Sequence, residues 1–249
     1  MTDRACPVGY VRITCGRYAV VTRAELAEDA RALLAEGTLY EAAARDLGAR
    51  TFEGRGLAYA ITLPASGMRV VVRRNRHGGL FAPLTRDLFL TPTRAPYELD
   101  VALRLRSAGV KTPDVVMYGV ERVHGLFCRA DVVTTEVTGG RDLSAYMMPD
   151  EHPESRAAAW SATRSLVAAL NAAGAWHHDL NVKNILLAPG ERGLDAWVLD
   201  VDRVEFGEAD SASVRAGNTA RLLRSARKWR DERGATFDER EIAAAGVFR

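Results

Sequence analysis

The pattern of apolar and polar residues predicts two short helices near the start of the chain, followed by a strand-rich stretch. Residues 23–47 carry Ala and Leu at helical spacing, with a break at Gly37. The expected strands beyond them are "GLAYAITLP", "MRVVVRRN", "VVMYGVERV" and "LFCRADVVTTEV". One helix, "APYELDVALRLRSAG", interrupts these strands and ends at Gly109.

The pattern becomes helical after Gly139 and Gly140. A long helix is expected over "ESRAAAWSATRSLVAALNAAG", and further helices from about Asn218 onward. Between them, a polar loop precedes "ILL", and "AWVLDVDRVEF" is expected to pair with that strand. We therefore expect an α+β, bilobal fold with a small β-rich lobe, a helical lobe and a cleft at residues 137–142.

Composition narrows the class of protein. The 249 residues are 47% hydrophobic and 27% charged, which is typical of a soluble globular chain. No run of eighteen apolar residues occurs, and the N-terminus lacks the apolar core of a signal peptide, so we expect a cytoplasmic protein. The three cysteines lack metal-ligand spacing and are expected to be reduced thiols.

Positive charge is concentrated in two stretches although the net charge is only +2. Residues 69–77 and 215–230 are rich in Arg and contain no acid. Such clusters suit phosphate groups, nucleic acid or an anionic membrane surface. A solvated helix face is the simpler alternative for either one alone.

The stretch "HHDLNVKNILL", residues 177–187, concentrates polar groups immediately before an apolar run. Asp179 and Asn184 lie in it, and Asp200 follows the next apolar run, "WVL". Aspartate and asparagine oxygens are ligands that Mg²⁺ accepts, and a separate carboxylate can orient a hydroxyl nucleophile. Each residue alone could merely cap a turn, but the combined spacing favours a phosphoryl-transfer site.

An upstream set of residues fits the same chemistry. Gly54 and Gly56 precede a strand, where glycines let backbone N–H groups approach phosphates, although a third glycine is missing. The following strand carries Arg73, a cation for ATP phosphates, and the next helix carries Glu98, which could orient it. Arg74 competes for the phosphate role, because alternation sends only one of the two arginines to each face.

Together these motifs resemble the protein-kinase-like fold and, within it, the lipopolysaccharide kinase family that includes the Kdo (3-deoxy-D-manno-octulosonic acid) kinases. The narrower likeness involves "RRNRHGGLFAPLTRDLFL", "HHDLNVKNILL", "LDVDR" and "NTARLLRSARKW". It covers about residues 50–230. The resemblance implies an N-lobe over residues 49–137 and a C-lobe over 138–249. Residues 1–48 fall outside it and are expected to form a helical extension, which could pack on the small lobe or lie at the membrane interface.

Several roles are implied by the resemblance. Asp179 would be the catalytic base or positioner, and Asn184 and Asp200 would bind Mg²⁺. ATP would be held by the residues Gly54, Gly56, Arg73, Glu98, Glu136 and Val137, the last two through backbone hydrogen bonds to adenine. Asp202 stands where most protein kinases have glycine, and its role is left open.

The resemblance implies transfer of the ATP γ-phosphate to a hydroxyl of Kdo on lipid A. The basic stretches would then favour peripheral contact with the cytoplasmic face of the inner membrane. Alternatives are another small-molecule, heptose or protein kinase on the same scaffold, or an ATP-binding pseudokinase, which the arginine at position 73 would suit. A nucleic-acid partner is not expected, because no aromatic stacking pattern accompanies the basic residues.

Overall fold

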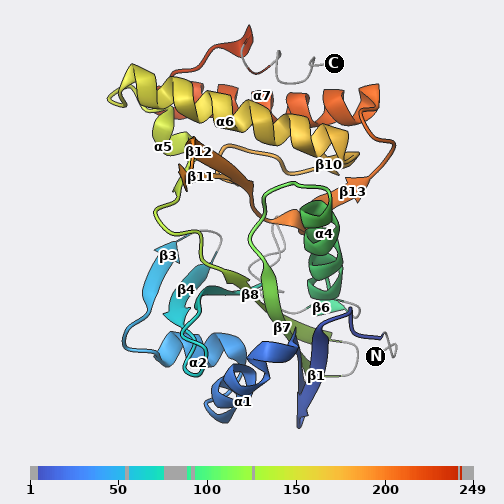
Figure 1. Ribbon diagram of the computed structural model, residues 1–249. Helices are drawn as coiled ribbons and strands as arrows, with labels where there is room; N and C mark the ends of the chain where they lie inside the picture. Colours follow the sequence, from blue (N-terminus) through green and yellow to red (C-terminus); the bar gives the residue numbers. More distant parts are fainter. Residues whose placement is uncertain are drawn as a thin grey trace. The chain divides into compact units, whose positions relative to one another are not determined.

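The computed structural model describes residues 5–53, 56–75, 89–90, 93–124, 127–240 and 242. These residues form two compact units, shown in Figure 1. Unit 1 comprises Met1–Asp100 and Asp114–Glu136, and unit 2 comprises Val101–Pro113 and Val137–Arg249. The division between the units falls within helix α4 (Ala95–Ser107).

Unit 1 is built on an eight-stranded antiparallel sheet. Its order is β1-β2-β7-β8-β5-β4-β3, and the short β6 also pairs with β8. The strands are β1 (Tyr10–Cys15), β2 (Tyr18–Arg23), β3 (Arg50–Glu53), β4 (Leu57–Thr62), β5 (Arg69–Arg74), β6 (Phe89–Leu90), β7 (Val115–His124) and β8 (Phe127–Thr135). The register of β5 against β8 sets Arg73 opposite Val132 and Arg74 opposite Asp131. The four strands predicted from apolar runs are thus present as β4, β5, β7 and β8.

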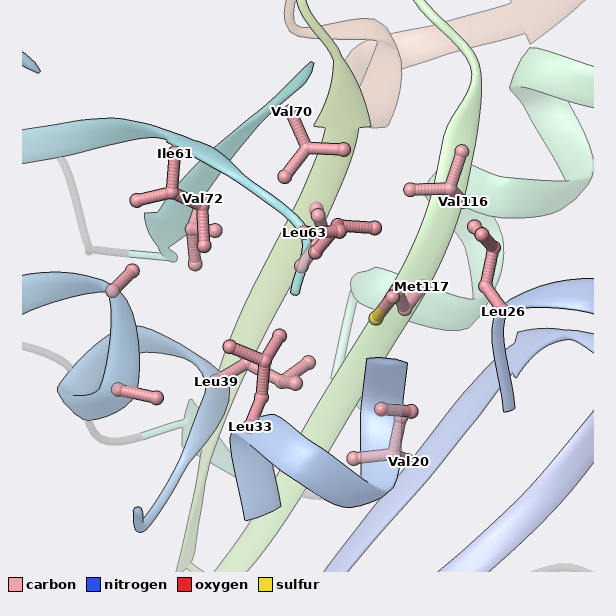
Figure 2. Close-up of a cluster of buried hydrophobic side chains, with 14 of the residues drawn as sticks. Val20, Leu26, Leu33, Leu39, Ile61, Leu63, Val70, Val72, Val116 and Met117 are labelled. Carbon is pink, nitrogen blue, oxygen red and sulfur yellow. The ribbon is translucent and has the colours of Figure 1, made fainter. Parts of the chain in front are cut away.

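The helices predicted within residues 23–47 pack into the core of unit 1. A 3₁₀ turn, η1 (Ala24–Leu26), leads into α1 (Ala27–Ala35), and α2 (Leu39–Arg45) follows. Thr38 and Glu41 form a reciprocal capping box at the start of α2. Leu33 and Leu39 are buried against sheet residues such as Val72, as Figure 2 shows. The helices therefore contribute to the same hydrophobic core as the strands.

The hairpin formed by β1 and β2 was not predicted. Three of the six residues of β1 are exposed and none is fully buried, so the strand lacks the alternation of a half-buried strand. The available signal was Gly16, which has φ +57° in the two-residue connection between Cys15 and Tyr18. Because β2 pairs with β7, residues before position 48 complete one side of the sheet. The proposed domain boundary at residue 48 stays a prediction.

Unit 2 combines helices with two small antiparallel sheets. Its helices include α5 (Leu143–Tyr146), α6 (Pro153–Ala172) and α7 (Ala212–Arg233). Its strands are β9 (Arg141–Asp142), β10 (Ala175–His177), β11 (Ile185–Gly190), β12 (Gly193–Val198) and β13 (Val204–Phe206). β10 pairs with β13, and β11 lies between β12 and β9. The predicted long helix is present as α6, with Pro153 in its first turn.

Two expectations for unit 2 differ from the structure. The last long helix begins at Ala212 rather than near Asn218, because the Ser211 side chain accepts the Val214 N–H and caps it. The stretch expected to form one strand divides into β12, a 3₁₀ turn (η2, Val201–Arg203) and β13. The division occurs where Asp200 adopts a left-handed conformation, which a continuous strand does not tolerate.

Among the described residues, no helix combines the length and the apolarity needed to cross a membrane.

The packing of α2 predicts that Leu39→Ala destabilises the protein. Leu39 is fully buried, so truncation leaves a cavity and should lower the free energy of unfolding by about 2–5 kcal/mol. Leu47→Ala is the control, because Leu47 is fully exposed and its loss should change stability by no more than about 0.5 kcal/mol. Urea denaturation of both variants measures the difference. Equal stability of the two would show that α2 is not part of the core.

Candidate functional site

The segment between β10 and β11 is a tightly hydrogen-bonded loop. The Asn181 side-chain oxygen accepts the N–H groups of Lys183 and Asn184, at 2.9 and 3.2 Å. The Asn184 side-chain amide donates to the Asp179 carbonyl at 2.9 Å. This amide contact leaves the Asn184 Oδ1 atom as the group that could bind a cation. The loop thus holds Asp179 and Asn184 in a fixed relation to each other.

His177 joins this loop to the segment that carries Asp200. Its ring is fully buried; Nδ1 accepts the Asp179 N–H at 3.2 Å, and Nε2 lies 3.0 Å from the Leu199 carbonyl. A ring that accepts at Nδ1 and donates from Nε2 is neutral. Burial lowers the pKa of His177 below 6.5, although the carboxylates of Asp179, Asp200 and Asp202 oppose this. The neutral ring therefore bridges two parts of the candidate site.

Asp200 is the residue after Leu199, whose carbonyl contacts the His177 ring. The Leu199 N–H donates to the Asn184 carbonyl at 2.8 Å, so the two backbone segments lie side by side. Asp200 has φ 53° and ψ 51°, a left-handed conformation that costs a non-glycine residue about 1 kcal/mol or more. Its side chain is exposed. Backbone strain retained at an exposed aspartate, one residue after the contact between Leu199 and Asn184, favours a functional role for Asp200.

The donor set of this region suits Mg²⁺. Among the residues described, no group of three or more His, Cys, Asp or Glu side chains could hold a metal ion. The candidate set instead offers the amide oxygen of Asn184 and the carboxylate of Asp200. Mg²⁺ is usually bound by one or two carboxylates and completes its shell with water and substrate phosphates. The residues present therefore fit Mg²⁺ that arrives together with a nucleotide.

Arg73 in unit 1 forms the ion pair that the sequence suggested. Its Nη2 contacts the carboxylate of Glu98, which is 2% exposed, and its Nη1 donates to the Asn75 side chain at 2.8 Å. The Arg73 side chain remains 26% exposed. A guanidinium oriented by a buried carboxylate, yet open to solvent, could contact phosphate groups.

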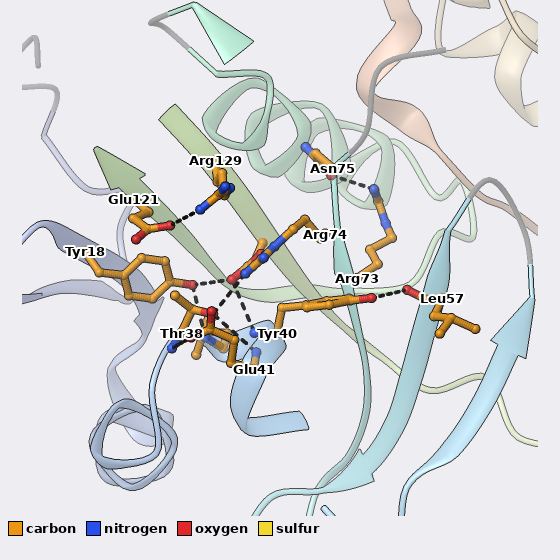
Figure 3. A network of polar contacts seen from close by, with 12 residues as sticks. Tyr18, Thr38, Tyr40, Glu41, Leu57, Arg73, Arg74, Asn75, Glu121 and Arg129 are labelled. Carbon is orange, nitrogen blue, oxygen red and sulfur yellow. Dashed lines mark hydrogen bonds and ion pairs between the residues drawn. The ribbon is translucent and has the colours of Figure 1, made fainter. Parts of the chain in front are cut away.

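Arg74, the alternative phosphate contact, is instead part of a buried polar network (Figure 3). It donates to Asp131 at 2.9 Å and to the Thr38 hydroxyl at 3.0 Å, and its guanidinium lies over the Tyr40 ring. Tyr18 donates to the same carboxylate at 2.8 Å. Burial, followed by the nearby carboxylate, raises the pKa of Tyr18 well above 10. These contacts favour Arg73 as the residue that binds phosphate.

The structure gives less information on the remaining candidates for nucleotide binding, Gly54, Gly56, Glu136 and Val137. Gly54 lies outside the described residues, and Gly56 sits in a bend directly before β4. The Glu136 N–H donates to the Arg69 carbonyl at 3.0 Å, so it is already used within unit 1. The Val137 carbonyl accepts the Gly140 N–H at 3.3 Å. The adenine contacts proposed for Glu136 and Val137 stay predictions.

Sequence reasoning missed two α7 residues that support the loop. Asn218 is fully buried; its side chain accepts the His177 N–H at 2.9 Å and donates to the Ala175 carbonyl and Asn171. Arg221 donates to the Asp179 carboxylate at 2.7 Å. The available signal for Asn218 was an asparagine at helical spacing from the apolar Val214 and Leu222. Nothing in the sequence alone pairs Arg221 with residue 179.

The chain is similar to known proteins over most of its length. A family model described as the lipopolysaccharide kinase (Kdo/WaaP) family matches residues 49–243. The chain is 31% identical over 194 residues to the 3-deoxy-D-manno-octulosonic acid kinase of Actinobacillus succinogenes, covering 76% of this chain and 79% of that protein. The protein of the same description from Stenotrophomonas maltophilia is 32% identical, covering 76% and 74%.

Among solved structures, the chain is similar to WaaP, described in complex with acyl carrier protein. The TM-score is 0.53 at 21% sequence identity, and the match covers 83% of this chain and 80% of that one. This likeness confirms the predicted protein-kinase-like fold. The individual roles of Asp179, Asn184 and Asp200 stay predictions.

The network around Arg74 predicts a structural role for this residue. Arg74→Ala leaves the Asp131 carboxylate, 1% exposed, without its buried counter-charge, so the free energy of unfolding should fall by about 3–5 kcal/mol. Arg69→Ala on the same strand is the control, since the Arg69 side chain is half-exposed and Glu136 keeps Arg50 as a second partner, so the loss should be no more than about 1 kcal/mol. Thermal and urea unfolding measure both. An Arg74→Ala variant that keeps full stability but loses ATP affinity would contradict this role.

Proposed function

Because this chain belongs to the lipopolysaccharide kinase (Kdo/WaaP) family, we propose that it phosphorylates Kdo on lipid A, using ATP, during assembly of the lipopolysaccharide inner core. The curated relatives described as Kdo kinases support this acceptor, since the chain covers 79% of the one from Actinobacillus succinogenes. A heptose or another small molecule on the same scaffold remains the alternative acceptor.

One observation supports the proposal most strongly. The loop from His177 to Asn184 is joined to the segment at Leu199 and Asp200 by two hydrogen bonds, one between the His177 ring and the Leu199 carbonyl and one from the Leu199 N–H to the Asn184 carbonyl. Within the loop, the Asn184 amide donates to the Asp179 carbonyl. These bonds bring a carboxylate, an amide oxygen and a second carboxylate into one region of unit 2. Phosphoryl transfer needs this combination of a nucleophile-orienting carboxylate and oxygen ligands for the nucleotide's metal ion.

In the proposed step, Asp179 accepts a hydrogen bond from the acceptor hydroxyl and then takes its proton. The hydroxyl oxygen forms a bond to the γ-phosphorus of ATP, and the bond from that phosphorus to the bridging oxygen breaks. The products are a sugar phosphate and ADP. Asp179 acts through its carboxylate, whose position is set by its own N–H on His177 and by Arg221.

We assign roles in nucleotide binding residue by residue. Asn184 and Asp200 would hold Mg²⁺, which neutralises charge on the phosphates. Arg73, oriented by Glu98, would contact the phosphates with a guanidinium rather than the ammonium usual in protein kinases. The buried Glu98 keeps this guanidinium in one orientation, which suits a bidentate contact.

The acceptor is attached to lipid A, so we propose peripheral contact with the cytoplasmic face of the inner membrane. The cations of α7 support this contact at about 1 kcal/mol each near an anionic surface. Three of these cations form ion pairs within the protein: Arg227 and Arg230 pair with Glu239, and Arg221 pairs with Asp179. The pairing lowers the pKa of Glu239 to about 2, so it stays charged at neutral pH.

The proposal predicts that Asp179→Ala lowers phosphate transfer from ATP to Kdo-bearing lipid A by about 10²–10⁴-fold, the usual contribution of a general base. Transfer of radiolabelled phosphate to the lipid measures the rate. Asp150→Ala, an exposed aspartate in the same unit, is the control and should leave the rate unchanged. An Asp179→Ala protein as active as the wild type would show that Asp179 is not the catalytic base. Wild-type protein that binds Mg²⁺–ATP but phosphorylates no lipid, sugar or protein would favour the pseudokinase alternative.

A further inference from the structure

Arg221 occupies a position that the proposed chemistry has not yet explained. It projects from α7, and its Nη2 donates to the Asp179 Oδ1 atom at 2.7 Å. The Arg221 side chain is 31% exposed and that of Asp179 is 18% exposed. The pair is therefore partly buried, yet open enough for a substrate to reach both groups.

The register of α7 against the loop fixes Arg221 in this place. Three residues before it, Asn218 is fully buried and accepts the His177 N–H. Four residues after it, the Ser225 hydroxyl accepts the Val182 N–H at 3.2 Å. Spacings of three and four residues put these side chains on one face of a helix. Arg221 thus lies between two anchoring contacts with the loop, and the guanidinium is held there by the fold.

The Arg221 guanidinium has N–H donors that do not contact Asp179. One of its five N–H groups is directed at Asp179, and its Nε is buried without a hydrogen-bond partner among the described residues. Buried donors in native proteins are nearly always satisfied, so this one favours a ligand. A guanidinium presents its donors in a planar fork that matches a carboxylate.

The acceptor itself is the ligand that fits. Its hydroxyl must reach Asp179, so the rest of the same sugar lies within contact of Arg221. An acidic sugar would bring a negative charge next to the Asp179 carboxylate, and like charges at such distances are costly unless a cation lies between them. The Arg221 guanidinium, which already contacts Asp179, is in a position to be the cation between the two carboxylates.

We propose that Arg221 binds the carboxylate of the acceptor sugar and thereby selects an acidic sugar over a neutral one. The proposal rests on the proposed function, because it takes Asp179 as the group that receives the acceptor hydroxyl. It makes Arg221 a specificity residue that contacts the substrate, in addition to its contact with Asp179. A purely positioning role, in which Arg221 only orients Asp179, would affect acidic and neutral acceptors equally.

The test compares Arg221→Gln with the wild type on two acceptors, Kdo-bearing lipid A and the same lipid with the Kdo carboxylate converted to its methyl ester. Arg221→Gln should lower kcat/KM for the acid by about 10- to 100-fold, as expected for losing a hydrogen bond to a charged group. For the ester, whose wild-type kcat/KM should already be low, the loss should be smaller than for the acid, because only the contact between Arg221 and Asp179 is removed. Arg192→Gln, an exposed arginine in the turn between β11 and β12 of the same unit, should leave both values unchanged.

Equal losses on both acceptors, or no loss on either, would overturn the proposal. Arg221→Lys is the second variant if Arg221→Gln does not fold; it keeps the charge without the fork, so it should lose activity on the acid alone. Wild-type protein that phosphorylates neither acceptor while binding Mg²⁺–ATP would contradict the proposed function instead. The two failures are therefore distinguishable.

Discussion

The candidate site depends on one buried, neutral histidine. His177 accepts the Asp179 N–H with Nδ1 and contacts the Leu199 carbonyl through Nε2, so the same ring holds both ends of the site. Since the ring is fully buried, charging it would carry a desolvation cost, which keeps it in the form that can accept and donate at once. Asn218 fixes the histidine backbone from α7, and through it the helix that carries Arg221. The loop, the Asp200 segment and α7 therefore form one hydrogen-bonded assembly within unit 2.

Unit 1 shows how two adjacent arginines acquire different roles. Strand alternation sends Arg73 and Arg74 to opposite faces of β5. On one face Arg74 meets Asp131 and the start of α2, where its charge is neutralised inside the protein. On the other face Arg73 meets Glu98 and stays partly exposed. The first 48 residues matter to this distinction, because Thr38 and Tyr18 complete the network that occupies Arg74 and Asp131.

Much of the fold was predictable because its central strands are apolar runs bounded by turns, and its long helices have apolar residues at helical spacing. The β1–β2 hairpin was missed because β1 has no fully buried residue, so its sequence shows no regular alternation of apolar and polar positions. The loop residues Asp179 and Asn184 were found through their spacing, which reflects a local turn. Arg221 could not be found in this way, since its contact with Asp179 spans 42 positions and depends on the register of α7. The sequence therefore predicted the candidate residues within one loop, whereas the contacts between residues far apart in the chain required the structure.

The most direct test of this account is the state of the His177 ring, read from its ¹⁵N chemical shifts in the folded protein. The structure requires a neutral ring with the proton on Nε2, because Nδ1 accepts the Asp179 N–H. Burial places the pKa below the ordinary 6.5, so the midpoint of any change in the shifts should lie at a pH below 6.5. A ring that titrates at or above 6.5, or that carries its proton on Nδ1, would contradict the hydrogen bonds on which the site depends.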